Sequence, residues 1–399
     1  MDIYERLGVT KRINGAGLLT RLGGSLMAPE VLDAMRDAAG SFVDMAELQT
    51  RASDVIAKHT GAEAGIVTGG AAAAITLGTA ACLTGLDVPR MERLPDTSGM
   101  PNEVVMFRAH RTGYDHAIRA AGARIVEVGF NDRSVGSGVR GLESWEIEAA
   151  IGPNTVAVAY AANPAGQPPL PAVVAVAEKH GLPVIVDSAA QLPPRTNLKR
   201  FISEGAALVA YSGGKAIRGP QGTGILCGRK DLIAAALIQQ LDMDILIGTW
   251  RPPAGLLDAY FQDRLPHHGL GRGFKVDKES IAGLLVALER FVAADDAADN
   301  QAREILLQGL AGLLADTAGV RPVVLSAAQT KRYPILELHF DPAVLKADAV
   351  AISRHLQRQP VPVHLSERRI DENVLLVDAS GLRPGDERLI AKAVTQAIA

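Results

Sequence analysis

The sequence predicts an α/β fold, in which a largely parallel β-sheet is flanked by helices and a smaller α+β unit follows. Short β-branched runs alternate with stretches that can form helices over residues 104–227. From about residue 280 the pattern changes to long helices rich in Ala and Leu. With 399 residues, 48% of them hydrophobic, the chain exceeds the usual size of one hydrophobic core. We therefore expect a large and a small domain.

The strands of the large domain are short and apolar. The strand-like runs are 104–107, 124–128, 155–160, 183–187, 207–211 and 224–227. Helices are predicted between most of them, as at residues 171–180, where Pro171 opens the helix and Gly181 follows it. This alternation predicts parallel pairing with helices on both faces. The turn between the last two runs is too short for a crossover helix, so the final strand is predicted to be antiparallel.

The C-terminal part combines helices and strands in a different order. Helices are predicted at 281–293, at 300–315 and from Asp386 onward, and strands at 333–340 and 374–378. We predict a large domain at 46–285, a small α+β domain at 286–399, and an N-terminal segment, 1–45, that joins the small domain or a partner subunit. Segment 86–103, with its Pro and charged residues, is predicted to be an exposed loop.

The composition excludes several classes of partner. A net charge of −3 and a pI near 6.3 provide no general attraction to polyanions, and no basic patch stands out, so we expect neither nucleic acid nor an acidic membrane as a partner. Cys82 and Cys227 lie in apolar stretches far apart, which favours buried thiols in a reducing compartment. No uncharged run approaches the roughly 18 residues needed to span a bilayer. A cytoplasmic location is expected.

Two buried strands end in residues that suit one cofactor. Asp187 closes the run 183–187, and Lys215 lies in a Gly-rich turn just past the run 207–211. A lysine amine can form a Schiff base with pyridoxal phosphate, and a carboxylate can keep its ring nitrogen protonated. Alternatively, Lys215 is a solvated lysine beside a turn and Asp187 is the N-cap of a helix. Their occurrence together favours the cofactor.

A second motif suits the phosphate of that cofactor. The residues Thr68, Gly69, Gly70 and Ala71 follow a short apolar run and open a predicted helix. Small residues at a helix start leave free N–H groups at its positive end, where phosphate binds well. The alternative is close helix packing by small residues. Ser212, three residues before Lys215, can donate to the same phosphate.

One histidine is a further candidate for the cofactor site. His110 follows the strand at 104–107 and can stack on the cofactor ring, although a histidine at a strand end is as often structural. His267 and His268 have no Cys or carboxylate at ligand spacing, so we predict no metal site.

Taken together, these motifs resemble fold-type I pyridoxal-phosphate enzymes of the selenocysteine synthase and D-glucosaminate-6-phosphate ammonia-lyase family, and the likeness is closer to the ammonia-lyase branch. The resemblance extends over residues 3–8, 12–17, 68–73, the strand that ends at Asp187, 212–215, 271–276 and 367–378. It implies a mostly parallel seven-stranded sheet. It also implies that Lys215 is the Schiff-base lysine, Asp187 the partner of the ring nitrogen and His110 the stacking residue. Gly69 and Gly70 would belong to the phosphate site.

The resemblance further implies a homodimer or a higher even oligomer with active sites at subunit interfaces. The loop 271–276 would approach the neighbour's cofactor, where Arg272 or Lys275 would hold its phosphate. Arg369 would grip the substrate's α-carboxylate, unless it is only a solvated member of a charge run. The candidates for the substrate's distal group are Arg21, Arg51, Arg195, Arg218 and Arg251.

The reaction that the resemblance implies is α,β-elimination of water with release of ammonia. The substrate would be a 3-hydroxy-2-amino acid, such as a sugar-derived 2-amino-2-deoxyaldonate resembling D-glucosaminate 6-phosphate, and the product a 2-keto-3-deoxy acid. A racemase or aldolase acting on a small hydroxy amino acid stays open, because orientation against the cofactor ring decides which bond breaks. A non-catalytic, cofactor-binding regulatory protein is the alternative from another class.

Overall fold

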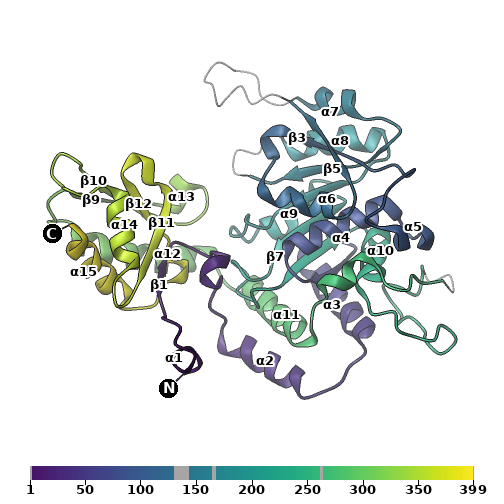
Figure 1. The fold of residues 1–399 in the computed structure, drawn as a ribbon, viewed down its shortest axis with the longest axis horizontal. Coiled ribbons are helices and arrows are strands. Elements are labelled where there is room, and N and C mark those ends of the chain that lie inside the picture. The colour runs from purple at the N-terminus through teal and green to yellow at the C-terminus, as the bar shows by residue number, and fades with distance from the viewer. Residues whose placement is uncertain (1, 130–142, 164–167, 261–263, 399) are drawn as a thin grey trace. The chain divides into compact units, whose positions relative to one another are not determined.

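The computed structural model describes residues 2–129, 143–163, 168–260 and 264–398, and the chain forms two compact units (Figure 1). Unit 1 comprises residues 1–26 and 293–399, and unit 2 comprises residues 27–292. Each unit has its own sheet and its own buried core.

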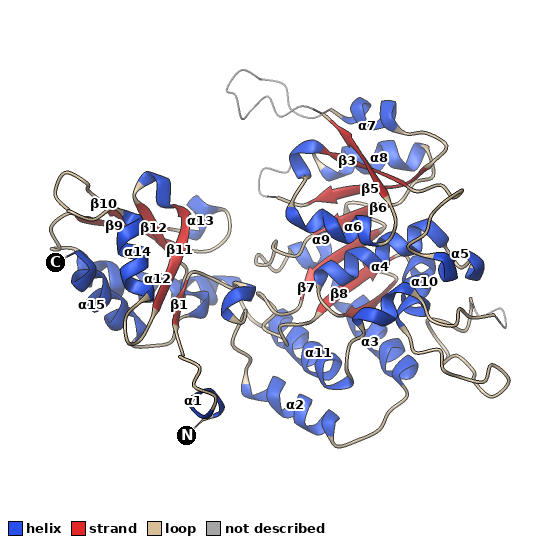
Figure 2. Ribbon diagram, in the orientation of Figure 1, coloured by secondary structure: helices blue, strands red, loops and turns tan. Residues whose placement is uncertain are grey.

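Unit 2 contains a seven-stranded sheet, shown in red in Figure 2, with the strand order β2-β8-β7-β6-β5-β3-β4. Its strands are β2 (Ala64–Thr68), β3 (Glu103–Phe107), β4 (Arg124–Val128), β5 (Thr155–Ala161), β6 (Val184–Asp187), β7 (Leu208–Ser212) and β8 (Gly224–Gly228). All neighbouring pairs are parallel except those of β8, which is antiparallel to both β2 and β7. The predicted fold class and the predicted reversal of the last strand are confirmed.

Helices cover both faces of this sheet. One face carries α4 (Ala71–Thr84), α6 (His116–Ala120) and α10 (Lys230–Gln240). The other carries α3 (Met45–Thr60), α7 (Ser144–Ala150), α8 (Leu170–Lys179), α9 (Asn197–Ser203) and α11 (Lys278–Ala293). Strand β3 shows why both faces are apolar: Val104 and Met106 pack into the first core, and Val105 and Phe107 pack into the second.

Unit 1 is the smaller α+β unit, with a five-stranded sheet in the order β1-β11-β12-β10-β9. Its strands are β1 (Ile13–Gly15), β9 (Val320–Leu325), β10 (Ile335–Phe340), β11 (Val363–Arg369) and β12 (Val374–Val377). Its helices are α1 (Ile3–Arg6), α12 (Asp296–Leu314), α13 (Ala327–Thr330), α14 (Ala349–Gln357) and α15 (Asp386–Ile398). Strand β1 is parallel to β11, and the other pairs are antiparallel.

The boundary near the N-terminus differs from the predicted segment 1–45. Residues 1–26 belong to unit 1, because β1 pairs with β11. Residues 27–45 belong to unit 2, where α2 (Pro29–Ala39) buries Val31 in the second core. The Lys278 ammonium also donates a hydrogen bond to the Ala38 carbonyl (2.8 Å). The second boundary falls at 292, rather than at 285.

The prediction of an exposed loop at 86–103 is wrong. The segment contains α5 (Val88–Arg93), which Asp87 caps by accepting a hydrogen bond from the Arg90 N–H. Met91 and Leu94 are buried in the core on the α4 side of the sheet. A few apolar residues scattered among charges show no periodicity, so only packing against α4 reveals that this segment is an ordered part of the core.

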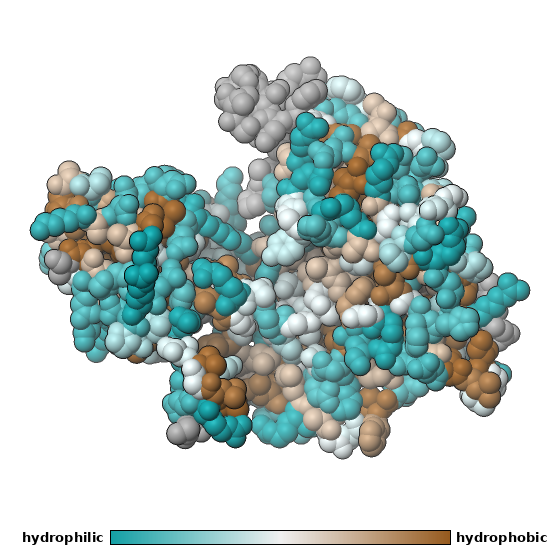
Figure 3. All heavy atoms as spheres, viewed as in Figure 1, coloured by the Kyte–Doolittle hydropathy of each residue, from teal (hydrophilic) through white to brown (hydrophobic). Residues whose placement is uncertain are grey.

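In the described ranges no helix has the length and apolarity that crossing a bilayer requires. On the face seen in Figure 3, hydrophilic side chains cover much of each unit, and hydrophobic patches lie among them.

Candidate active site

Asp187 and Lys215 are brought together at the carboxyl ends of β6 and β7, which are neighbours and parallel. Asp187 is the last residue of β6, and Lys215 follows β7 by three residues. Burial raises the pKa of Asp187, and the Ala189 N–H, 3.0 Å from Asp187 Oδ1, and the positive charge of Lys215 partly offset this rise. The Asp187 carboxylate is thus partly desolvated and lies close enough to the Lys215 amine to interact with its charge.

Close packing around the turn explains the two glycines that precede Lys215. A Cβ on Gly213 would lie 2.1 Å from Thr223 Oγ1, and one on Gly214 would lie 2.5 Å from the Cα of Gln221. Gly213 therefore makes room for the side chains of Thr223 and Leu284, and Gly214 makes room for the backbone and side chain of Gln221. Arg218, at φ 61°, closes the turn by donating its N–H to the Lys215 carbonyl (3.0 Å).

Gly70 opens a cradle at the start of α4. It precedes the helix at φ 109° and ψ 165°, no side chain caps the helix, and a Cβ at this position would meet nothing within 4 Å. The first intrahelical bond runs from the Ala74 N–H to the Gly70 carbonyl (3.0 Å), so the N–H groups of residues 71–73 have no helical acceptor. Thr68 Oγ1 donates to the Gly70 carbonyl (2.9 Å) and helps to hold this conformation. The cradle suits a phosphate.

Gly224 joins the cradle to the lysine turn. It pairs with Thr68 on one side and with Ser212 on the other, at the edge of the sheet where β2 and β7 both end. A Cβ on Gly224 would lie 2.4 Å from the carbonyl carbon of Gly70 and 2.6 Å from the Ala71 nitrogen, so only glycine fits. Thr68, Ser212 and the start of α4 therefore meet at one place, as a shared phosphate site requires.

His110 is in the core. It is 2% exposed, and its ring lies edge-on to Phe107 (centroids 5.3 Å apart) and to Tyr160 (4.7 Å). Thr112 and Tyr114, which follow shortly after it, line a small cavity together with Asp187. The stacking role of His110 stays a prediction. Thr112 and Tyr114 were not predicted from the sequence, where only their closeness to His110 could have indicated them.

Arg272 lies in a short 3-10 helix, Leu270–Phe274, and Lys275 follows it directly, in the loop that precedes α11. Arg272 Nη2 makes an ion pair with Asp242 Oδ2 (2.6 Å), and both basic residues line a cavity of about 340 Å³. The backbone of the loop approaches the glycine turn of its own chain, because a Cβ on Gly69 would lie 2.8 Å from the Phe274 carbonyl oxygen. That the loop also holds a neighbour's phosphate stays a prediction.

Arg369, at the end of β11, already binds carboxylates. Its guanidinium makes two hydrogen bonds to Glu372, at 3.0 and 2.5 Å, and another to Glu337. These bonds, to Glu372 first, raise the pKa of Arg369. A substrate carboxylate would have to replace one of them, so the predicted role requires an exchange of partners. Arg218 is exposed, at the lysine turn of unit 2.

His268 has carboxylates nearby that local spacing does not reveal. Its Nε2 lies 3.3 Å from Asp244 Oδ1, and Asp242 completes a group whose candidate ligand atoms lie within 4.8 Å of one another. All three residues are exposed, and Asp242 is paired with Arg272. We assign no metal to this group.

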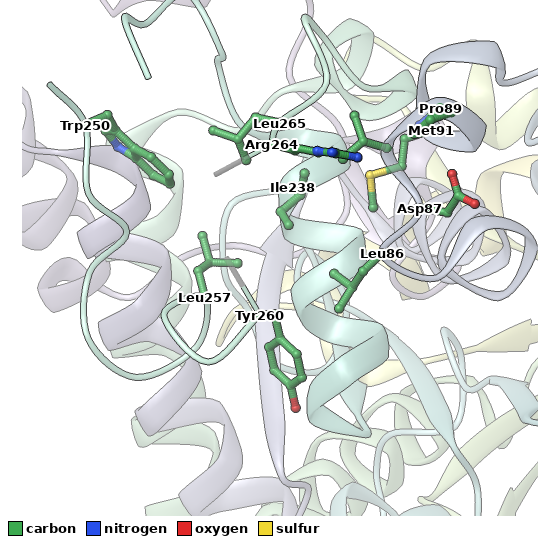
Figure 4. Close-up of a pocket in the computed structure, with 11 residues that line it drawn as sticks. Leu86, Asp87, Pro89, Met91, Ile238, Trp250, Leu257, Tyr260, Arg264 and Leu265 are labelled. Carbon is green, nitrogen blue, oxygen red and sulfur yellow. The ribbon is translucent and has the colours of Figure 1, made fainter. Parts of the chain in front are cut away.

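A separate cavity, of about 310 Å³, is lined by residues of α5, of α10, of the segment 250–260 and of the pair 264–265 (Figure 4). Trp250, Tyr260 and Arg264 surround it together with several aliphatic side chains. None of the predicted site residues lines this cavity, so it is distinct from the cofactor site.

Comparisons with known proteins identify the family. The Aminotransferase class-V family matches residues 114–241, which include Asp187 and Lys215. The chain is 35% identical over 298 residues to D-glucosaminate-6-phosphate ammonia lyase of Salmonella typhimurium, a match that covers 73% of this chain and 70% of that protein. The chain belongs to the family of fold-type I pyridoxal-phosphate enzymes that includes D-glucosaminate-6-phosphate ammonia-lyase. A solved structure of D-glucosaminate-6-phosphate ammonia-lyase superimposes with a TM-score of 0.81 at 29% identity, covering 100% of this chain and 98% of that one.

Two further proteins are similar to this chain. A 5'-C-glycyluridine monooxygenase-decarboxylase of a Streptomyces species is 30% identical over 98% of this chain and 91% of its own length. The L-seryl-tRNA(Sec) selenium transferase of Desulfovibrio desulfuricans is 25% identical over 74% of this chain, which spans 58% of that protein. The chain is thus a pyridoxal-phosphate-dependent enzyme, in the ammonia-lyase branch of the family. The alternative of a non-catalytic regulatory protein is not supported.

The described residues fit this cofactor. The open cradle before α4 suits its phosphate, the Asp187 carboxylate suits its ring nitrogen, and the Lys215 amine suits its aldehyde. All three come from the carboxyl edge of one sheet, where open α/β sheets bind their ligands.

Proposed function

We propose that this enzyme eliminates water from a 3-hydroxy-2-amino acid and releases its nitrogen as ammonia. The substrate is a sugar-derived 2-amino-2-deoxyaldonate, of the type represented by D-glucosaminate 6-phosphate, and the product is a 2-keto-3-deoxy acid. The observation that carries the proposal is the full-length similarity to D-glucosaminate-6-phosphate ammonia-lyase, at a TM-score of 0.81. The placement of Asp187 beside Lys215 supports it.

Each of the two residues has a defined task. Bound pyridoxal phosphate supplies an electron sink for the charge that develops at the substrate's α-carbon. Asp187 holds a proton on the ring nitrogen, and its burial strengthens that pairing. Lys215 would hold the cofactor's aldehyde, and its amine, once free, would take the proton from the substrate's α-carbon. The β-hydroxyl leaves with a proton as water. Another water then replaces the nitrogen, so the reaction yields one keto acid and one ammonia for each substrate.

The test follows ammonia and 2-keto acid together. Holoenzyme incubated with D-glucosaminate 6-phosphate should release both in a 1:1 ratio without an added keto acid. A requirement for a keto-acid co-substrate would indicate a transaminase. Return of the epimer without ammonia would indicate a racemase, and release of an aldehyde would indicate an aldolase.

The Streptomyces relative provides a second candidate, because its match extends over 98% of this chain. A monooxygenase-decarboxylase consumes oxygen and releases carbon dioxide. An oxygen electrode and a carbon dioxide assay on 5'-C-glycyluridine would therefore distinguish the two candidates. We favour the lyase, because the identity to the Salmonella protein is higher, at 35% against 30%.

We also propose that the enzyme works as a homodimer, or a higher even oligomer, in the cytoplasm. Exposed apolar side chains on the α2–α3 connection, Phe42 and Val43, support association. Neither Cys82 nor Cys227 forms a disulfide. Light scattering of the purified protein tests the oligomeric state. An R272Q/K275Q variant mixed with K215A tests for interfacial sites, because hybrid dimers would regain activity only if the loop acts on the neighbour's cofactor.

A further inference from the structure

Tyr114 and Asp187 line the same small cavity at the carboxyl edge of the large sheet, and the walls of this cavity also include residues of α4, β5 and α6. Tyr114 belongs to a short 3-10 helix, Gly113–Asp115, that follows β3. Its side chain is 68% exposed, and its hydroxyl makes no hydrogen bond to any part of the chain that the structure describes. A phenol is thus presented beside the residue that suits the cofactor's ring nitrogen.

The backbone around Tyr114 is fixed, although its side chain is exposed. The Tyr114 N–H donates to Thr112 Oγ1 (3.2 Å). The next residue, Asp115, is buried, and its carboxylate makes ion pairs with Arg111 and, at 3.2 Å, with Arg119. Charge-assisted hydrogen bonds to a buried carboxylate hold this turn in one geometry. The position of the phenol is therefore set by a rigid turn, as a catalytic group requires.

The turn is also joined to the helix that begins at the cradle. Thr76 Oγ1, on α4, donates to the carbonyl of Ala117, on α6 (3.0 Å). Ile75 of α4 and Ile118 of α6 line the same cavity as Tyr114. Because α4 starts at Gly70, the cradle and the phenol are held together by direct packing of neighbouring elements.

The proposed elimination needs an acid as well as a base. When the bond between the β-carbon and the hydroxyl breaks, the leaving oxygen needs a proton, because hydroxide is a poor leaving group. Positioned His, Asp, Glu, Lys, Tyr and Cys side chains provide such protons in enzymes. Lys215 already has the task of removing the α-proton, and Asp187 that of pairing with the ring nitrogen. The proton donor for the β-oxygen is a separate residue.

Two other acids that line the cavity are unsuited to this task. Tyr160 is 3% exposed, its hydroxyl donates to the Pro168 carbonyl (3.0 Å), and burial raises its pKa. Asp115 is kept ionised, because the hydrogen bond from Arg111 lowers its pKa. Among the described residues that line this cavity, Tyr114 is therefore the acid with a proton to give.

We propose that Tyr114 is the catalytic acid of this elimination and protonates the leaving β-hydroxyl. The inference rests on the proposed function. Lys215 takes the α-proton, and the electron pair of that carbon–hydrogen bond forms the double bond to the β-carbon. The carbon–oxygen bond breaks with its electron pair on oxygen, and Tyr114 Oη gives this oxygen a proton, so that water leaves. A proton then passes from the Lys215 ammonium to the Tyr114 phenolate, which restores both groups.

The Y114F variant removes the hydroxyl and keeps the ring. With D-glucosaminate 6-phosphate, kcat for ammonia release by the holoenzyme should fall about 10²–10⁴-fold, with little change in KM, because general acid catalysis is lost. The cofactor's visible absorption and the melting temperature establish that Y114F is loaded and folded. The matched control is Y4F, which changes an exposed tyrosine of α1 in unit 1 and should keep the wild-type rate.

A second substrate isolates the leaving-group step. In the analogue of D-glucosaminate 6-phosphate whose 3-hydroxyl is replaced by chlorine, chloride leaves with its electron pair and needs no proton. Y114F should therefore release ammonia from this analogue at a rate within severalfold of the wild type. An equal loss with both substrates would overturn the proposal, since it would show that Tyr114 acts on something other than the leaving oxygen.

Hydrogen exchange provides a readout that does not depend on product. In D₂O, Y114F should exchange the α-proton of D-glucosaminate 6-phosphate for deuterium faster than it releases ammonia, because Lys215 still removes this proton. NMR of the recovered substrate measures the exchange. Loss of exchange together with elimination would overturn the proposal, because an earlier step would then require Tyr114.

Two further outcomes separate this proposal from the proposed function. If the wild type releases ammonia and a keto acid and Y114F does so at the same rate, the role of Tyr114 fails while the proposed function stands. A loss seen in Y114A but not in Y114F would lead to the same conclusion, since the ring alone would then be required. If the wild type releases neither product, the proposed function fails, and the acid role fails with it.

Discussion

Asp187 and Lys215 share one edge of a sheet because β6 and β7 are adjacent and parallel, and the charge of Lys215 lowers the pKa that burial raises at Asp187. In the absence of a positive partner, the buried carboxylate is disfavoured. A protonated ring nitrogen beside Asp187 would therefore stabilise the buried carboxylate as a second positive partner.

Replacement of Lys215 by alanine should remove the covalent link to the cofactor. We expect the visible absorption of the bound cofactor to change, and activity to fall by about 10²–10⁴-fold or more, since the proton-transfer group is lost as well. Borohydride reduction followed by peptide mapping should label Lys215 in the wild type. The control is K199A, which changes an exposed lysine of α9. Label on another lysine in the wild type would contradict the assignment.

Replacement of Asp187 by asparagine should have opposite effects on the apoprotein and the holoenzyme. The folded-state pKa of Asp187 is raised, so the folded apoprotein binds more protons than the unfolded chain. Stability from this group is therefore present at low pH and lost as the pH rises through the folded pKa. At pH 7.5, apo D187N should melt no lower than the apo wild type, whereas cofactor should raise Tm less in D187N. A large loss of apo stability would contradict this.

Replacement of Gly70 by alanine should damage the phosphate cradle through the backbone. Gly70 has φ 109° and ψ 165°, which side chains rarely adopt, so the variant should lose about 1–3 kcal/mol of stability or shift the turn. We expect the Kd of the cofactor to rise severalfold, measured by fluorescence titration. The control, G309A, lies in α12 with nothing within 4 Å of its Cβ, and should gain roughly 0.5–1 kcal/mol. Normal cofactor affinity in G70A would remove this residue from the site.

Replacement of Arg369 by glutamine should lower the melting temperature more clearly than it changes the affinity for substrate. The variant leaves Glu337, which is 8% exposed, without its guanidinium partner, although His339 still contacts it at 2.8 Å. The double variant R369Q/E337Q should recover part of the lost stability. A large rise in KM at an unchanged Tm would instead support the predicted grip on the substrate carboxylate.

The thiol of Cys227 should be unreactive in the folded protein. Burial raises the pKa of Cys227 to about 12, so little thiolate exists at pH 8. Alkylation by iodoacetamide, followed by mass spectrometry, should be slow until denaturant is added. Rapid labelling of native protein would show that β8 opens readily.

The local sequence pattern was sufficient to predict much of the fold of unit 2. Alternating strand and helix signals over residues 104–227 predicted its parallel sheet, and the short turn at Lys215 predicted the reversal of β8. The signals for each strand and helix come from residues close in sequence, although the strands themselves pair over long stretches of the chain. The burial of α5 could not be predicted in this way, because Met91 becomes a core residue only through its packing in the tertiary structure.

The small unit was harder to predict, because its sheet depends on long-range pairing. Strand β1 is three residues long and pairs with β11, about 350 residues later. So short a run carries little periodicity of its own. The same limit applies to His268, whose nearby carboxylates are separated from it by a long segment of the chain.

The sequence by itself determined which chemical groups are present and which strand each one follows: an amine in a glycine turn, a carboxylate after an apolar run, and small residues at a helix start. These are local features, set by neighbouring residues. Only the tertiary structure decided that Gly224 joins the cradle to the lysine turn, that Arg369 is held by two glutamates, and that Arg12 lies beside His364. Close packing and strand register create these contacts, and no local pattern encodes them.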